Sequence, residues 1–177
     1  MRTAVLLLLA SLSLNAAVTG VVVNTTTGKP QSGVTVTMTK FGAGGMEPAG
    51  SVKTDGEGRF TFDGDAGSAH LLQAEYQGVR YSAPMNQAAG APLEIAVFDS
   101  AASVPGAKAE QHMIMVEANG EELVVNETVI INNPSQTTWS NPKAGTVKVF
   151  IPEAAGDNIM ARVAAPGEAD GLVLVRI

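Results

Sequence analysis

The sequence predicts an all-β protein, and three observations lead to that fold class. Residues 34–39 and 59–62 alternate apolar with polar side chains, which is the period of a strand with one buried face. Turns centred on Gly56, Gly78 and Gly120 separate short runs rich in β-branched residues. No helical apolar period is sustained beyond the N-terminal segment. Short strands between turns predict a sandwich or barrel rather than alternating strand–helix units.

The N-terminal segment, residues 1–17, has the three-part layout of a signal peptide. Arg2 gives it a basic start, residues 4–14 form an apolar run, and small residues lead up to Ala17. That run is well short of the roughly 20 residues that span a bilayer. We place cleavage after Ala17, with a shift of one residue left open, and a buried N-terminal helix is the alternative. The mature chain is expected to be exported to the periplasm or beyond, and to be soluble.

Composition narrows the classes of function. The formal net charge of −6 and the absence of a basic cluster argue against nucleic acid or an anionic membrane surface as partner. The chain has no cysteine, which excludes disulfides, thiolate catalysis, Cys-ligated metals and a lipid-modified cysteine anchor. No cofactor is expected. Aromatic residues make up only 5% of the chain, so the core is expected to consist mainly of aliphatic side chains.

The first predicted domain covers residues 18–99. Its alternating strands place Val34, Val36 and Met38 on one face, and Phe60 and Phe62 on one face of a later strand. Further strands are expected at residues 18–24 and 93–98, and a hairpin is expected from residues 69–76 and 79–82.

A small-residue stretch containing Pro-Gly, residues 100–109, is interpreted as a linker to a second domain, residues 110–177. The pair Asn119-Gly120 predicts a hairpin there. The expected strands are 111–117, 123–132, 146–151, 159–163 and 172–177. We expect a second small β-sandwich-like domain. Either Leu172–Ile177 closes it, or an open edge invites strand-edge assembly.

The first domain resembles the carboxypeptidase regulatory-like domain of bacterial exported proteins. The residues that carry the resemblance are Thr19–Val23, Gly28–Pro30, Gly33–Val36, Thr54–Phe62 and Gly78. It implies a transthyretin-like (prealbumin-like) β-sandwich, usually a non-catalytic module attached to exported peptidases, outer-membrane receptors or adhesive proteins. The second domain resembles the β-domain that follows such modules in some bacterial exported proteins, through the run from Val125 to Asn132.

Glu127 is the first candidate for ligand contact. It falls on the otherwise apolar face of its strand, where a buried carboxylate needs a partner or stays protonated. One interpretation is a pair with Lys148, Arg162 or Arg176, and the other is a ligand-facing carboxylate on an open sheet face. The two histidines, His70 and His112, fall in different predicted domains and are interpreted as partly exposed residues without a site.

Three aromatic residues are the remaining candidates, because aromatic rings on a β-sandwich stack on sugars. Trp139 is the only tryptophan and lies in a polar segment. Tyr76 and Tyr81 flank the Gln77-Gly78 turn. The alternative for Trp139 is that it covers one end of the second domain's core.

The sequence therefore predicts a non-catalytic binding or structural module of the bacterial cell envelope that contacts a protein or a glycan. A carbohydrate-binding accessory protein is the first alternative, and a small exported hydrolase is the second. No catalytic or metal-ligating set is identified, and we expect no nucleic-acid partner and no stable membrane insertion.

Overall fold

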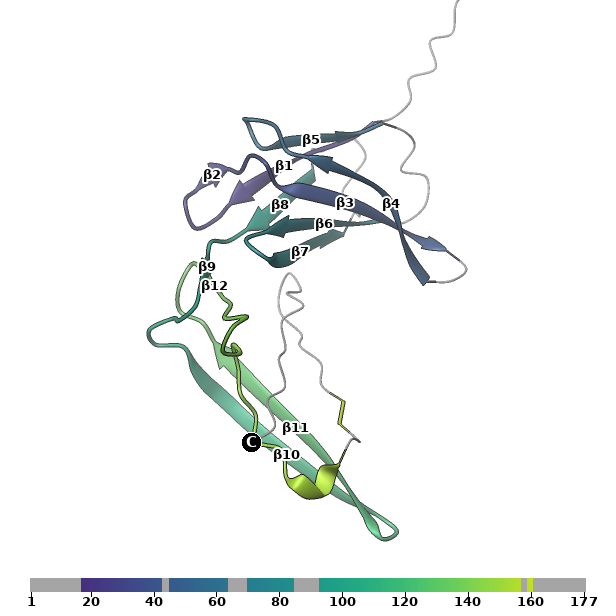
Figure 1. Cartoon of the computed structure of the whole chain (residues 1–177), viewed down its shortest axis with the longest axis vertical. Helices are drawn as coiled ribbons and strands as arrows, with labels where there is room; N and C mark the ends of the chain where they lie inside the picture. The colour runs from purple at the N-terminus through teal and green to yellow at the C-terminus, as the bar shows by residue number, and fades with distance from the viewer. Residues whose placement is uncertain (1–16, 43–44, 64–69, 85–92, 157–158, 161–177) are drawn as a thin grey trace, which may run out of the picture.

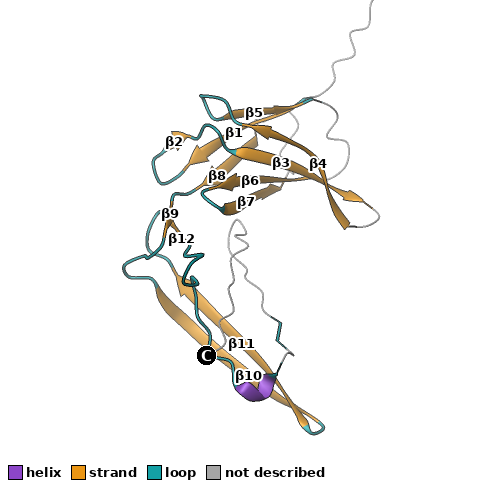
Figure 2. Ribbon diagram, in the orientation of Figure 1, coloured by secondary structure: helices purple, strands orange, loops and turns teal. Residues whose placement is uncertain are grey.

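A computed structural model describes residues 17–42, 45–63, 70–84, 93–156 and 159–160. The predicted leader, except Ala17, and most of the last twenty residues therefore lie outside the described part. Within it the chain forms strands and one short 3₁₀ helix, η1 (Glu153–Ala155), which confirms the all-β fold class (Figure 2).

Two sheets pack into a sandwich (Figure 1). In the first sheet, β1 pairs antiparallel with β2 and β5 and parallel with β8. The strands of this sheet are β1 (Val18–Asn24), β2 (Lys29–Pro30), β5 (Arg59–Phe62) and β8 (Leu93–Val97). The second sheet is antiparallel with the order β4-β3-β6-β7. Its strands are β3 (Thr35–Gly42), β4 (Gly45–Lys53), β6 (His70–Tyr76) and β7 (Val79–Pro84).

The hydrophobic core lies between these sheets and is mostly aliphatic. The predicted inward residues of both alternating segments are buried, because their side chains point to the facing sheet. The rings of Phe60 and Phe62 lie edge to face with centroids 6.0 Å apart. The buried apolar set is Val18, Val22, Val34, Val36, Met38, Phe60, Phe62, Leu72, Ala74, Val79, Tyr81, Leu93, Ile95 and Val97.

Gly20 allows the close packing of β1 against its neighbours. A Cβ atom at this position would lie 2.4 Å from both the Leu93 carbonyl oxygen and the Phe60 ring. Only glycine fits where the backbone is approached this closely.

The hairpin predicted across Gln77-Gly78 is confirmed as β6–β7. Both residues of its two-residue turn have positive φ, 50° for Gln77 and 76° for Gly78. Positive φ at both central positions is the signature of the type I′ turn, whose twist matches that of the flanking strands.

The segment predicted as a linker, residues 100–109, is partly built into β structure. Strand β9 (Ser100–Ala101) pairs in parallel with β12 (Thr138–Trp139). The amide of Ser140 also donates to the Ala101 carbonyl at 3.0 Å. Its small side chains therefore serve close strand pairing here rather than an extended spacer.

Beyond β9 the chain forms a long antiparallel hairpin of β10 (Lys108–Asn119) and β11 (Glu122–Asn132). It extends away from the sandwich in Figure 1. The turn lies on Gly120–Glu121, one residue later than the predicted Asn119-Gly120. Gly120, the first residue of the turn, has a φ of 67°. Glycine adopts this positive φ more readily than other residues do.

The predicted strand 146–151 joins no sheet in the described part of the chain. It runs beside the hairpin and ends at η1 (Figure 1). Val147 and Val149 instead line a hollow that the hairpin also lines.

Candidate functional site

The β10–β11 hairpin exposes apolar side chains along its length. Leu123 is 69% exposed, whereas Leu72 in the sandwich core is 0% exposed. Such a concentration of exposed apolar side chains on one element is typical of an interaction surface. The exposed set on the hairpin is Met113, Ile114, Met115, Val116, Leu123, Val124, Val125 and Ile130.

The strand register divides these side chains between two faces, because directly opposite residues share a face. The first face follows from the pairs Ile114–Glu127 and Val116–Val125. We call it the Glu127 face, and it comprises His112, Ile114, Val116, Leu123, Val125, Glu127 and Val129. The other is the methionine face, and it comprises Gln111, Met113, Met115, Glu117, Val124, Asn126, Thr128 and Ile130. Exposed apolar side chains lie on both faces, although Met113 and Met115 are opposite the polar residues Thr128 and Asn126. This differs from a sheet that has one buried apolar face and one solvated polar face.

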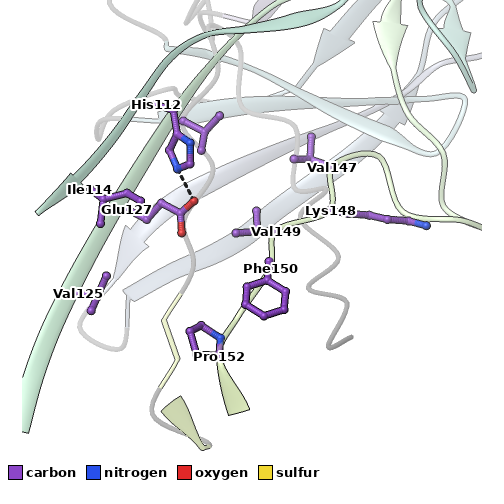
Figure 3. A pocket seen from close by; sticks show the side chains of 10 residues that line it. His112, Ile114, Val125, Glu127, Val147, Lys148, Val149, Phe150 and Pro152 are labelled. Atoms are coloured by element: carbon purple, nitrogen blue, oxygen red, sulfur yellow. Dashed lines mark hydrogen bonds and ion pairs between the residues drawn. The ribbon is translucent and has the colours of Figure 1, made fainter. Parts of the chain in front are cut away.

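A hollow of about 470 Å³ lies between the Glu127 face and residues 147–152. Figure 3 shows the side chains of Val149, Phe150 and Pro152 opposite those of the hairpin. Its lining is His112, Ile114, Val125, Glu127, Val129, Val147, Lys148, Val149, Phe150 and Pro152. Apolar residues therefore dominate this hollow, and its charged or titratable groups come from three positions.

Glu127 is paired with a residue that the sequence interpretation set aside. Its Oε1 lies 2.6 Å from Nε2 of His112, with the side chains 30% and 50% exposed respectively. The expectation of a buried carboxylate paired with Lys148 is therefore wrong. Lys148 lines the same hollow, but its side chain extends away from Glu127 in Figure 3. The two arginine alternatives, Arg162 and Arg176, lie outside the described residues.

The pairing of His112 with Glu127 has a signal in the sequence. A hairpin turning near Gly120 brings residues 112 and 127 to the same face of adjacent strands. His112 is therefore not without a partner, contrary to the expectation of a residue outside any site. An exposed pair of this kind contributes little to stability, but it gives the hollow a titratable polar edge.

Trp139 lies in β12 and is half-buried beside the linker segment. Its indole Nε1 donates to the Ala102 carbonyl at 3.3 Å. The ring therefore helps to hold the junction between the sandwich and the hairpin, with part of its surface in water.

The two candidate tyrosines belong to the sandwich rather than to a surface shared with Trp139. Tyr81 is buried in the core, and its hydroxyl contacts Thr138 Oγ1 at 2.7 Å and donates to the Phe98 carbonyl at 3.0 Å. Burial raises the pKa of Tyr81 above its ordinary value of 10.0. Tyr76 donates to Asp99 Oδ1 at 2.9 Å. Partial burial, then the hydrogen bond and charge of Asp99, raise the pKa of Tyr76 as well.

A polar network at the end of β1 fixes this junction. The Asn24 side chain is 1% exposed, and its amide donates to Gln31 Oε1 at 3.0 Å and to Asp99 Oδ1 at 2.8 Å. Its carbonyl oxygen accepts from the Thr26 amide at 3.0 Å. Thr26 in turn donates its hydroxyl to the Gln136 carbonyl, beyond the hairpin. Because these bonds run from β1 to both flanks of the hairpin, the base of the hairpin is tied to the sandwich.

Two further observations limit the chemistry of the described residues. The described residues contain no group of three or more His, Cys, Asp or Glu side chains that could hold a metal ion. The hollow beside His112 is lined by no hydroxyl or thiol side chain from the described part of the chain.

No protein-family model matches the sequence, and no curated protein matches it significantly. Within the described ranges, no helix has the length and apolar character that a membrane crossing requires. Any proposal about function therefore has to come from the geometry of the molecule itself.

Proposed function

We propose that this protein is a non-catalytic, exported binding module of the bacterial cell envelope that contacts a protein partner through the β10–β11 hairpin. The observation that carries the proposal is the exposure of large apolar side chains on both faces of this hairpin. A sandwich with its own core supports the hairpin, and the Asn24–Asp99 bond ties the hairpin's base to that sandwich. Apolar surface removed from water on binding would supply the driving force.

A rigid base and an exposed apolar arm suit partner recognition. The sandwich has no comparable exposed set among its described residues, and Met46 at the start of β4 is its one large exposed apolar side chain there. Partner contact is therefore expected at the hairpin rather than on the sandwich faces.

Export is the second part of the proposal, and the layout of residues 1–17 supports it. Expression of the full chain in a bacterium tests it. We expect the protein in the periplasm or medium with a new N-terminus at Val18, read by mass spectrometry of the intact protein. Retention of Met1 on cytoplasmic protein would contradict export.

The third part is that the sandwich is a carboxypeptidase regulatory-like module. The two-sheet sandwich supports this, as do the residues from Thr19 to Gly78 that carry the resemblance. In that family such a module usually accompanies another functional unit, which agrees with a binding rather than a catalytic role.

Matched variants test the binding surface. Met113→Lys places a charge on the methionine face, and Thr37→Lys places one on the solvent side of β3, outside the core. Both proteins are used as bait, after chemical cross-linking in an envelope fraction, alongside the unmodified protein. We expect the same cross-linked protein with the unmodified bait and with Thr37→Lys, and its loss with Met113→Lys. Equal recovery with all three baits would contradict recognition through this face.

The carbohydrate-binding alternative depends on Trp139 alone, because Tyr81 is buried and Tyr76 is hydrogen-bonded at the junction. A glycan array with Trp139→Ala as control tests it. Glycan binding that is lost in Trp139→Ala would favour this alternative over protein recognition.

A further inference from the structure

Among the residues that the structure describes, no strand lies beside the outer edge of β10. Within the described residues β10 pairs with β11 alone, in a two-stranded sheet. No backbone hydrogen bond from another described segment reaches residues 108–119. A twelve-residue strand with one open side presents a row of amide and carbonyl groups that can template another strand.

The centre of this edge lacks the devices that normally protect one. It contains no proline, and the segment from Gln111 to Val116 carries no Lys, Arg, Asp or Glu. The charged residues of β10, Lys108, Glu110 and Glu117, lie toward its ends. A two-stranded hairpin is also marginal in water, and further strands stabilise it.

The sequence of β10 is complementary to itself in one antiparallel register. If a two-fold axis passes through Ile114, this residue lies opposite its own copy, and Met113 lies opposite Met115 of the second copy. His112 then faces Val116 of the second copy. The central pairs are therefore apolar with apolar, except that His112 faces Val116, and such pairs favour cross-strand association.

The charges agree with the same register. Lys108 of one copy falls beside the turn of the other, where Glu121 and Glu122 are adjacent. Opposite charges meet at both ends of the paired strands, and no like charges lie directly opposite. Such charge complementarity selects a register and suppresses competing ones.

We propose that a second copy of this chain pairs with the β10 edge about a two-fold axis at Ile114. The four-stranded sheet then has the order β11-β10-β10-β11. The inference rests on the proposed function in treating the hairpin as an assembly element, and it assigns the edge, not the faces, to self-association. The two apolar faces remain available to the partner protein.

Because the chain has no cysteine, a single cysteine substitution can form a disulfide only between two copies of the protein. Such variants therefore report the geometry of the dimer. Ile114 and Val125 share one face and are both 56% exposed, so they make a matched pair. In the proposed dimer residue 114 lies about 5 Å from its own copy, within disulfide reach. Residue 125 lies on the outer strand, about 20 Å from its copy, because three strand spacings and an offset of four residues along the strands separate the two.

We expect Ile114→Cys to form a disulfide-linked dimer under mild oxidation and Val125→Cys to remain monomeric. Non-reducing electrophoresis measures both, and circular dichroism confirms that each variant keeps its β structure. Cross-linking of neither variant, or of Val125→Cys alone, would overturn the proposal. Equal cross-linking of both would indicate collision rather than this register and would overturn it too.

Analytical ultracentrifugation separates this inference from the proposed function. We expect the unmodified protein to dimerise with rising concentration and Ile114→Lys to stay monomeric, because the substitution places two charges together at the axis. If the unmodified protein stays monomeric while Met113→Lys still loses the cross-linked partner, self-pairing is wrong and partner recognition stands. If the unmodified protein dimerises and no cross-linked partner depends on Met113, self-pairing stands and partner recognition through the methionine face is wrong.

Discussion

The sandwich and the hairpin are both built from alternating strands, yet they treat their apolar residues in opposite ways. In the sandwich, the inward side chains of one sheet meet those of the other and are buried. In the hairpin, side chains of the same kinds point into water on both faces. The difference lies in the layer that faces each sheet, because a strand buries its apolar side only against a second layer.

This contrast separates stability from recognition in one chain. The sandwich has a core and a tightly packed backbone at Gly20, and it supplies the stability. The hairpin has strands without a complete second layer, and residues 147–152 cover only part of one face. Exposed apolar surface that folding does not use is available for binding.

The largest expected effect compares two leucines. Leu72→Ala removes a fully buried side chain and leaves a cavity, so it should lower the free energy of unfolding by about 2–5 kcal/mol. Leu123→Ala, at the exposed end of the hairpin, should change it by less than about 0.5 kcal/mol. Urea denaturation followed by circular dichroism measures both, and equal losses would break the comparison.

The next comparison uses two asparagines. Asn24→Ala removes a buried side chain and leaves several half-buried partners at the junction without it, so it should lower the free energy of unfolding by about 1–3 kcal/mol. Asn126→Ala, exposed on the methionine face, should have almost no effect. A negligible loss for Asn24→Ala would show that the junction network does not stabilise the sandwich.

A smaller effect depends on pH. The pKa of Tyr81 is raised in the folded protein, so its contribution to stability is complete below pH 10.0 and is lost as the pH rises through the folded-state pKa. Tyr81→Phe should cost about 1 kcal/mol at neutral pH, through the hydrogen bonds to Thr138 and Phe98. That difference should shrink above pH 10.0. Urea denaturation of the unmodified protein and of Tyr81→Phe, at neutral pH and above pH 10.0, measures this difference in stability. A difference that grows with pH would contradict a raised pKa for Tyr81.

The smallest expected effect concerns the pair on the hairpin. His112→Gln should change the free energy of unfolding by less than about 0.5 kcal/mol, because the side chains of the pair with Glu127 are still 50% and 30% exposed. Thermal denaturation against the unmodified protein measures the change. A loss as large as that of Leu72→Ala would mean that the hairpin belongs to the folded core.

Much of the sandwich could be predicted from local patterns. The inward positions Val36 and Phe60 follow from a period of two, and the Gln77-Gly78 turn follows from its chemistry. The same period across β7 places Tyr81 on the same face as the buried Val79, so the sequence pattern is sufficient to predict the burial of Tyr81. Local pattern decides which face a side chain takes, and in these strands that is enough.

The hairpin was less predictable, because exposure depends on what a distant segment does. Alternation and the turn near Gly120 place Glu127 and His112 on one face, but only three-dimensional packing shows that this face is partly open. Residues 146–151 have the pattern of a strand and join no ladder in the described chain, since pattern alone supplies no partner edge. The linker-like composition of Ser100–Ala101 likewise conceals its pairing with β12.

Amide hydrogen exchange of the dilute, unmodified protein tests the central claim most directly. The account predicts strong protection in β1, β3 and β6 and much faster exchange throughout β10 and β11, because the hairpin lacks a covering layer. Protection of β10 and β11 equal to that of the sandwich, at concentrations where the protein is monomeric, would contradict the claim that the hairpin is an exposed binding arm.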